Sequence, residues 1–120
     1  MTNLLAVFVG GGIGSILRFG ISSLIQNASA STLPWATLVS NGLSTLVLGW
    51  LIFKLELDQS SWLFYFLVVG FCGGFSTFST FSNETFMLIK NNQTPWALLN
   101  IAISLGLCLS ILFLVSKQLK

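Results

Sequence analysis

The sequence predicts an all-α membrane protein with four transmembrane helices, because it is too apolar for a soluble domain and has the length of four membrane crossings. Only 7% of the 120 residues are charged and 54% are hydrophobic. Globular domains carry about 25% charged residues, so this chain lacks the polar side chains to cover a surface that faces water. A hydrocarbon core about 30 Å thick requires roughly 20 helical residues per crossing, and the length therefore allows four helices with short connections.

Four apolar runs, separated by polar or charged stretches, define the expected helices of this single domain. The first run, residues 4–25, ends at the polar stretch 26–32. Pro34 suits a first helical turn, and charged residues from Lys54 onward end the second run. Tryptophans lie near the ends of the runs, as they do at membrane interfaces. The expected helices span residues 4–25, 34–53, 62–89 and 95–116.

The basic residues are almost evenly divided between the two sides of the membrane. Four crossings place both termini and Lys54 on one side, so Lys54, Lys117 and Lys120 oppose Arg18 and Lys90. Cytoplasmic loops normally carry an excess of Lys and Arg, and this excess sets the orientation. The near balance predicts insertion in both orientations and an antiparallel, dual-topology homodimer. The alternative is a single orientation, which the insertion machinery selects from the weak charge bias.

The first expected helix contains a glycine-rich stretch and one charged side chain. Gly10 and Gly14 form a GxxxG pair, which predicts a close contact with another helix. Arg18 stands four residues after Gly14, in the second half of the expected helix. A charge at this depth must pair, or reach the membrane surface along its own aliphatic stem. The functional alternative is a cation in a vestibule that draws an anion towards a pore.

The second and fourth expected helices each carry a polar stripe. The stripe in residues 34–53 consists of Thr37, Asn41 and either Ser44 or Thr45, at spacings of three and four, and the weaker stripe in the last helix consists of Asn100, Ser104 and Cys108 at a spacing of four. Lipid cannot satisfy the Asn41 carboxamide, so this side chain faces protein or water. It either forms an interhelical hydrogen bond or donates its NH₂ hydrogens to an anion path. Ser104 either belongs to such a path or bonds to a carbonyl of its own helix.

The third expected helix, residues 62–89, is predicted to be broken near its midpoint. Gly73 and Gly74 are followed by alternating hydroxyl and aromatic residues up to Ser82, a poor composition for a continuous helix. Irregular backbone at membrane depth is tolerated where it is buried in protein or lines a cavity, and its free carbonyls can hold a cation. If residues 73–77 of two antiparallel subunits meet, their carbonyls can face one monovalent ion.

Two phenylalanines follow the expected break. Phe78 and Phe81 are three positions apart and share a helix face, with Ser79 and Thr80 alongside. An aromatic ring has a positive edge, so ring edges together with hydroxyl donors suit a small, strongly hydrated anion. Packing against lipid or core is the alternative for either ring alone. Glu84 lies one turn beyond Thr80, where a carboxylate near the interface is normally capped or paired.

The remaining composition excludes several classes of function. The chain has no histidine, three acidic residues and a net charge of +2. These numbers argue against a histidine-rich metal site and against nucleic acid as a partner. No nucleophile has a plausible base beside it, so we do not expect an enzyme. Cys72 and Cys108 lie in apolar runs, where a thiol usually packs as a small hydrophobe.

Three stretches of the sequence resemble one known family. Residues 11–19 (GGIGSILRF), the pair Asn41-Gly42 and, above all, residues 70–84 (GFCGGFSTFSTFSNE) are similar to the Fluc (CrcB) fluoride channels of bacteria. The resemblance extends over the whole chain in length, four-helix layout and order of the motifs. It implies an antiparallel homodimer in the lipid bilayer of the bacterial cytoplasmic (inner) membrane, with two fluoride pores and a structural sodium ion on the central axis. The implied activity is passive export of fluoride, which lowers cellular fluoride toxicity.

The resemblance also implies roles for individual residues. The backbone carbonyls of Gly73 and Ser76 would hold the sodium ion, and Arg18 would belong to the vestibule. The residues that would line the fluoride path are Asn41, Phe78, Phe81, Ser79, Thr80, Ser104 and Glu84. Cys108 occupies a position where we expect a hydroxyl, and a thiol donates a weaker hydrogen bond.

Two other functions remain as alternatives. A small proton-coupled multidrug exporter also has four helices, but it needs a membrane-embedded acid, typically in the first helix. That helix contains Arg18 and no acid, and Glu84 is the only acidic residue within an expected helix. A structural subunit without a pore explains the glycines as packing, but it explains the Phe78 and Phe81 pair poorly.

Overall fold

The computed structural model describes residues 1–119, and all regular secondary structure in that range is helical. Four helices are long and apolar enough to cross a membrane. They span Thr2–Ala28, Trp35–Phe53, Trp62–Lys90 and Thr94–Gln118. No end differs from the range predicted by sequence by more than three residues, the largest difference being Ala28 against residue 25. The prediction of an all-α protein with four membrane-spanning helices is confirmed.

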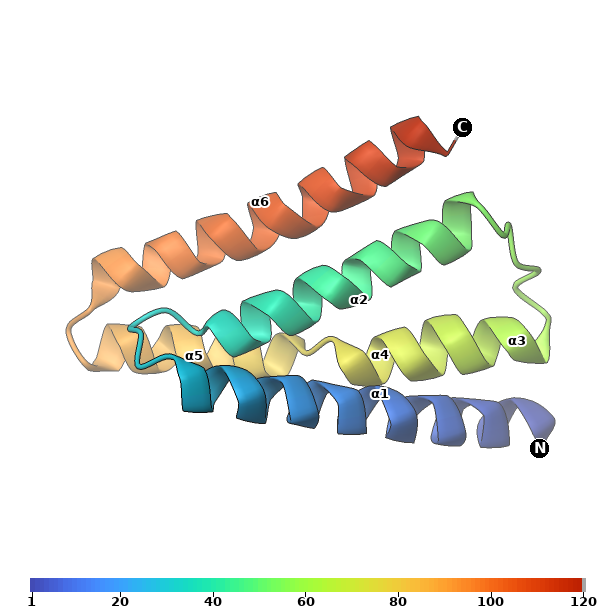
Figure 1. Ribbon diagram of the computed structural model, residues 1–120, viewed down its shortest axis with the longest axis horizontal. Helices are drawn as coiled ribbons and strands as arrows, with labels where there is room; N and C mark the ends of the chain where they lie inside the picture. The colour runs from blue at the N-terminus through green and yellow to red at the C-terminus, as the bar shows by residue number, and fades with distance from the viewer. Residues whose placement is uncertain (120) are drawn as a thin grey trace.

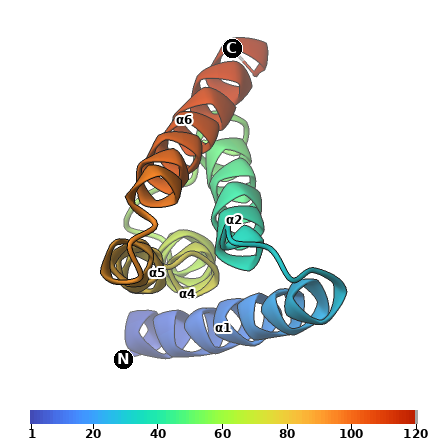
Figure 2. The ribbon, with the colours of Figure 1, turned by 90° about the vertical axis from the view of Figure 1, so that its left-hand side faces the viewer.

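The first, second and fourth crossings each consist of one helix, whereas the crossing that is third along the chain is divided into several pieces (Figure 1). In chain order the elements are α1 (Thr2–Ala28), α2 (Trp35–Phe53), α3 (Trp62–Phe64), the π-helix η1 (Tyr65–Cys72), α4 (Gly73–Phe75), α5 (Phe78–Lys90) and α6 (Thr94–Gln118). Both marked termini and the connection from α2 to α3 lie at the same end of the molecule (Figure 1). Seen along the helices, α1 lies against η1 and α4, on the side away from α6 (Figure 2).

The interior of the protein is rich in small and polar side chains, whereas most of the large apolar side chains face outward. Ser40 and Ala97 are 0% and 1% exposed, while Phe8 and Phe113 are 79% and 68% exposed. This distribution is the reverse of a soluble domain and suits an outer surface that is solvated by lipid. The buried polar side chains are Thr37, Ser40, Ser44, Thr85, Asn100 and Ser104. The chain is therefore a multi-pass membrane protein.

Glycines bring α1 into backbone contact with the third crossing. A Cβ atom at Gly10 would collide with the carbonyl oxygen of Phe66, and one at Gly14 with that of Phe71. Only glycine permits this approach, because the opposing atoms belong to the backbone and cannot rotate away. The close helix contact predicted from Gly10 and Gly14 is confirmed.

Nothing in the sequence pattern predicts the π-helix η1. Helical turns of this width are rare and often lie next to functional sites. Gly70, within η1, faces α1, because a Cβ atom there would lie 2.9 Å from the Val7 carbonyl oxygen. η1 ends at Cys72, directly before the two glycines of the third crossing. The wide turns therefore lead into the least regular part of that crossing.

Local hydrogen bonds hold the connection between α2 and α3. Ser60 donates its N–H to Asp58 Oδ1 at 2.9 Å and its hydroxyl to Asp58 Oδ2 at 2.8 Å. These two bonds favour the charged carboxylate and lower the pKa of Asp58 below its ordinary value. Ser61 then caps α3, because its hydroxyl oxygen accepts a hydrogen bond from the Phe64 N–H at 3.1 Å. The connection is thus an ordered polar turn outside the membrane-spanning helices.

Candidate functional site

The third crossing loses helical geometry at Ser76 and Thr77, which we call the interruption. Their backbone torsions are extended, with φ −85° and ψ 158° at Ser76 and φ −151° and ψ 116° at Thr77. The Ser76 hydroxyl donates to the Cys72 carbonyl at 2.9 Å and so closes the preceding turn. Thr77 caps the following helix, because its Oγ1 accepts a hydrogen bond from the Thr80 N–H at 3.2 Å. Serine and threonine therefore end one helix and begin the next.

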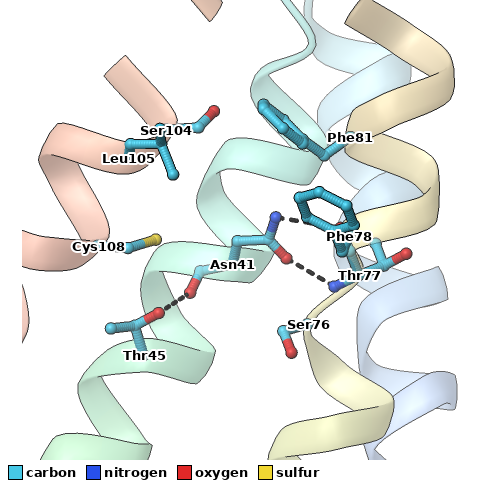
Figure 3. A pocket seen from close by; sticks show the side chains of 9 residues that line it. All are labelled: Asn41, Thr45, Ser76, Thr77, Phe78, Phe81, Ser104, Leu105 and Cys108. Carbon is cyan, nitrogen blue, oxygen red and sulfur yellow. Dashed lines mark hydrogen bonds between the residues drawn. The ribbon is translucent and has the colours of Figure 1, made fainter. Parts of the chain in front are cut away.

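Asn41 on α2 binds the interruption through both ends of its carboxamide. Its Oδ1 accepts a hydrogen bond from the Thr77 N–H at 2.8 Å, and its Nδ2 donates to the Thr77 carbonyl at 3.3 Å (Figure 3). The carboxamide supplies the acceptor and the donor that an extended peptide would otherwise find on a neighbouring strand. Of the two interpretations made from sequence, the interhelical hydrogen bond is the one present in this structure.

Arg18 reaches the same part of the third crossing from α1. Its Nε donates to the Gly74 carbonyl at 3.1 Å, and the side chain is half-buried. The hydroxyl of Ser15, one turn earlier, lies at 3.5 Å from the same carbonyl oxygen. A charge at membrane depth is tolerated when it bonds to a backbone carbonyl in this way. The bond from Nε anchors the guanidinium beside the interruption.

The carbonyls around the interruption differ in whether a donor reaches them. The Cys72 carbonyl accepts hydrogen bonds from the hydroxyls of Ser44 and Ser76 at 3.0 and 2.9 Å. Within residues 1–119, by contrast, no N–H or O–H donates to the carbonyl of Gly73 or Ser76. The same part of the chain contains no group of three His, Cys, Asp or Glu side chains that could hold a metal ion. The Phe75 carbonyl also has no donor in this range, so the free carbonyls are those of Gly73, Phe75 and Ser76. Gly73 and Ser76 are the two that the resemblance implies as cation ligands.

An open pocket of about 230 Å³ lies beside the interruption, between α2, α5 and α6 (Figure 3). It brings together residues that are far apart in the sequence, and none of the side chains that line it is charged. Four residues of the fluoride path implied by the resemblance, Asn41, Phe78, Phe81 and Ser104, share this pocket. Its lining residues are Asn41, Thr45, Ser76, Thr77, Phe78, Phe81, Ser104, Leu105 and Cys108.

Phe78 and Phe81 project from the beginning of α5 towards the side of the pocket that Asn41 and Ser104 line (Figure 3). Their ring centroids are 5.7 Å apart and the ring planes are inclined by 41°. A tilted pair presents ring edges as well as ring faces to its surroundings. Phe78 is 77% exposed in the single chain, so most of its ring is free to contact an ion or another molecule.

Ser79 and Thr80 lie outside this pocket, in a cluster of hydroxyls at the start of α5. The Thr77 hydroxyl donates to Thr80 Oγ1 at 3.1 Å and lies 3.3 Å from Ser79 Oγ. These contacts link the interruption to the first turn of α5. The structure thus places Ser79 and Thr80 next to the pocket rather than on its wall.

Glu84 also lies outside the pocket, further along α5. Thr37 donates its hydroxyl to Glu84 Oε1 at 2.7 Å. Glu84 Oε2 is buried and finds no hydrogen-bond partner in the described part of the chain. The carboxylate lines two other pockets, of about 140 and 290 Å³, that adjoin the connection between α1 and α2. The predicted residues therefore fall into one group around Asn41 and another around Glu84.

Thr45 and Leu105 also line the pocket. Thr45 was one of two alternatives for the polar stripe through Asn41, and Leu105 was not predicted. Thr45 follows Asn41 by four positions and donates its hydroxyl to the Asn41 carbonyl at 2.7 Å. Helical spacing from Asn41 is therefore the sequence signal that identifies Thr45. Leu105 has no such signal, because nothing in the sequence distinguishes it from the other leucines of α6.

Comparisons with known proteins agree over almost the whole chain. The sequence matches the family described as CrcB-like protein, Camphor Resistance (CrcB), over residues 5–116. The protein named Fluoride-specific ion channel FluC of Flavobacterium psychrophilum is 38% identical over 109 residues, covering 89% of this chain and 88% of the relative. The protein of that name from Shewanella halifaxensis is 38% identical over 116 residues, covering 95% and 93%. A third, from Paramagnetospirillum magneticum, is 41% identical over 108 residues, covering 86% and 84%. On these matches, the chain belongs to the CrcB family.

Proposed function

We propose that the chain is a fluoride-selective ion channel that passively exports fluoride across the bacterial cytoplasmic membrane and so lowers fluoride toxicity. Relatives that match almost the whole chain are named fluoride-specific ion channels. The observation that carries the proposal is the uncharged pocket beside the interruption, where two phenylalanine rings and the hydroxyl of Ser104 line one space. In this proposal the protein transports an ion and catalyses no reaction.

The pocket has the chemistry that passage of a small hydrated anion requires. Fluoride exchanges part of its water shell for hydroxyl donors and for the positive edges of the Phe78 and Phe81 rings. A lysine or arginine in the pocket would hold the anion too tightly for rapid release, and no charged side chain lines it. Neutral donors and ring edges therefore favour entry and release.

Outside the pocket, the fluoride path extends towards the group around Glu84. Ser79 and Thr80 supply hydroxyls at the start of α5, next to the capping hydroxyl of Thr77. Glu84 stands at the far end of the path, beside the pockets at the α1–α2 connection. The guanidinium of Arg18 attracts anions to the vestibule by its charge.

Two antiparallel copies of the chain form the working channel, with two pores per dimer. The pocket is open in the single chain, and a second copy would close it. A Cβ atom at Gly12, Gly73 or Gly106 would meet no atom within 4 Å in the same chain. Glycine weakens a helix by about 0.5–1 kcal/mol relative to alanine, so glycines that face open space favour close approach by another helix. The near balance of basic residues supports the antiparallel orientation.

A structural sodium ion belongs at the carbonyls of Gly73 and Ser76. Both oxygens lack a donor within the described chain, and unwound backbone carbonyls are suitable ligands for sodium in membrane proteins. Gly73 is exposed, so a second copy can bring the equivalent carbonyls to the same ion. When bound, the ion supplies positive charge that offsets the dipoles of these carbonyls.

The alternative of a small proton-coupled multidrug exporter has little support from the site. Its coupling requires a carboxylate that exchanges protons with solvent along the substrate path, typically in the first helix. α1 carries Arg18 and no acid, and Glu84 is bonded to Thr37 outside the main pocket.

Ion efflux from liposomes that contain the purified protein tests the proposal. The liposomes are loaded with potassium fluoride and potassium chloride, valinomycin carries the compensating potassium, and two ion-selective electrodes record the anions. We expect rapid fluoride efflux that depends on valinomycin, without chloride efflux. Equal efflux of both anions, or of neither from liposomes with correctly assembled protein, would contradict the proposal.

A further inference from the structure

We propose that Asn41 is a positioning residue for the cation site, because it fixes the interruption in the conformation that leaves the Gly73 and Ser76 carbonyls free. The inference rests on the proposed function, in which a sodium ion binds at these two carbonyls. It differs from the role implied by resemblance, in which the Asn41 carboxamide donates to fluoride.

The Asn41 carboxamide binds both backbone polar groups of one residue in the interruption. Asn41 Oδ1 and Nδ2 bond to the N–H and the carbonyl of one and the same residue, Thr77, at 2.8 and 3.3 Å. The Thr77 N–H belongs to the peptide that carries the Ser76 carbonyl, and the Thr77 carbonyl belongs to the next peptide. The two bonds therefore hold both peptides that flank the Thr77 Cα, whereas a single bond would leave one of them free to rotate. Asn41 therefore determines the direction of the peptide that follows Ser76.

No other hydrogen bond in the described chain ties the interruption to another crossing. Within residues 1–119, every other hydrogen bond of Ser76 and Thr77 reaches a residue no more than four positions away along the chain. Asn41 is 36 positions from Thr77 and belongs to a different crossing. It is thus the hydrogen-bonded link between α2 and the interruption.

The hydrogen bonds around the interruption determine which of its carbonyls stay free. The Cys72 and Gly74 carbonyls accept hydrogen bonds from Ser44 and Arg18, and the Thr77 carbonyl accepts one from Asn41. The described chain leaves the Gly73 and Ser76 carbonyls without a donor. If the peptide of Thr77 rotates, its N–H is released and can bond to the Gly73 carbonyl in the ordinary helical manner. The Asn41 carboxamide prevents this by holding the Thr77 N–H.

Sodium-dependent stability tests the inference without measuring transport. The purified protein is unfolded by heat in detergent over a range of sodium concentrations, with N-methylglucamine as the replacement cation. We expect sodium to raise the unfolding midpoint of the wild type. In Asn41→Ala the same rise should require about tenfold more sodium, or should be absent, because two hydrogen bonds no longer hold the peptide.

Asn100→Ala is the matched control, since Asn100 also forms a buried interhelical hydrogen bond, to Thr85 at 2.9 Å, and does not contact the interruption. We expect it to lower the unfolding midpoint and to keep the wild-type response to sodium. If Asn41→Ala keeps that response, or if Asn100→Ala loses it equally, the positioning role is wrong.

A second variant keeps the inference testable if Asn41→Ala does not fold. Asn41→Asp has nearly the same shape and keeps the acceptor for the Thr77 N–H, but when ionised it cannot donate to the Thr77 carbonyl. We expect it to need several-fold more sodium than the wild type, and an unchanged sodium response would overturn the inference.

Fluoride efflux from the wild type separates this inference from the proposed function. If wild-type liposomes release fluoride but sodium has no effect on wild-type stability, the inference fails and the channel proposal stands. If sodium stabilises the wild type through Asn41 but no fluoride is released, the channel proposal fails and the positioning of the carbonyls by Asn41 stands.

Discussion

Replacing Gly14 by alanine tests the backbone contact that holds the third crossing against α1. A Cβ atom at this position would collide with the Phe71 carbonyl oxygen and would lie 2.8 Å from the Phe75 backbone nitrogen. Both obstacles are backbone atoms, so the collision is relieved only if α1 moves away from η1 and α4. We therefore expect Gly14→Ala to destabilise the folded protein.

The expected magnitude follows from two opposing effects. Alanine stabilises a helix interior by about 0.5–1 kcal/mol relative to glycine. Inserting a methyl group into a fully packed contact costs about 1–3 kcal/mol, and a collision with backbone lies at the upper end of this range. The net loss is about 2 kcal/mol, which lowers the ratio of folded to unfolded protein by roughly 30-fold.

Gly11→Ala is the control from the same glycine-rich stretch. A Cβ atom at Gly11 would lie 3.7 Å from the Gly70 carbonyl oxygen, which is an ordinary van der Waals contact. We expect this variant to match the wild type or to be slightly more stable. Unfolding in mixed micelles with increasing SDS, followed by circular dichroism, measures both variants. If Gly14→Ala is as stable as Gly11→Ala, the reasoning from backbone contact is refuted.

Three further experiments test the pocket and the cation site. Phe81→Ile should nearly abolish fluoride efflux and leave the dimer intact, because it removes the ring edge and keeps an apolar side chain; an unchanged efflux rate would remove Phe81 from the path. A methanethiosulfonate reagent should modify Cys108 in the pocket before the buried Cys72 and slow efflux, and inhibition that persists in Cys108→Ser would contradict this. A Cβ atom at Gly73 would meet no atom of its own chain within 4 Å. Gly73→Val should therefore weaken dimer assembly or the sodium response by crowding the second copy. A normal dimer with a normal sodium response would count against this cation site.

Local composition and spacing were sufficient to predict the helices and one helix contact. The four helix ranges lie close to the predicted ones because membrane hydropathy depends on the residues of each segment alone. The contact of Gly10 and Gly14 was predictable for a similar reason, since a GxxxG pair needs a close neighbour whichever helix supplies it. That Asn41 faces away from lipid, towards protein or water, also followed from sequence, because lipid cannot satisfy its carboxamide.

The hydrogen-bond partners within the site could not be predicted in the same way. Thr77 is 36 positions from Asn41, and Glu84 is 47 positions from Thr37. Spacing rules relate residues of one helix, whereas these pairs depend on how neighbouring helices are rotated and shifted against each other. For this reason the sequence does not predict which pocket each residue lines, and the structure places Asn41 in one pocket and Glu84 in two others.

The reversal potential of the reconstituted protein in a planar bilayer tests passive, selective fluoride conduction most directly. A tenfold fluoride gradient is opposed by an equal gradient of chloride, so that the two anions have equilibrium potentials of opposite sign. We predict that the current reverses at the fluoride potential, about 59 mV for a tenfold gradient of a monovalent ion, and that a pH gradient does not move it. Reversal near zero or at the chloride potential, or a shift with the pH gradient, would contradict a passive fluoride channel.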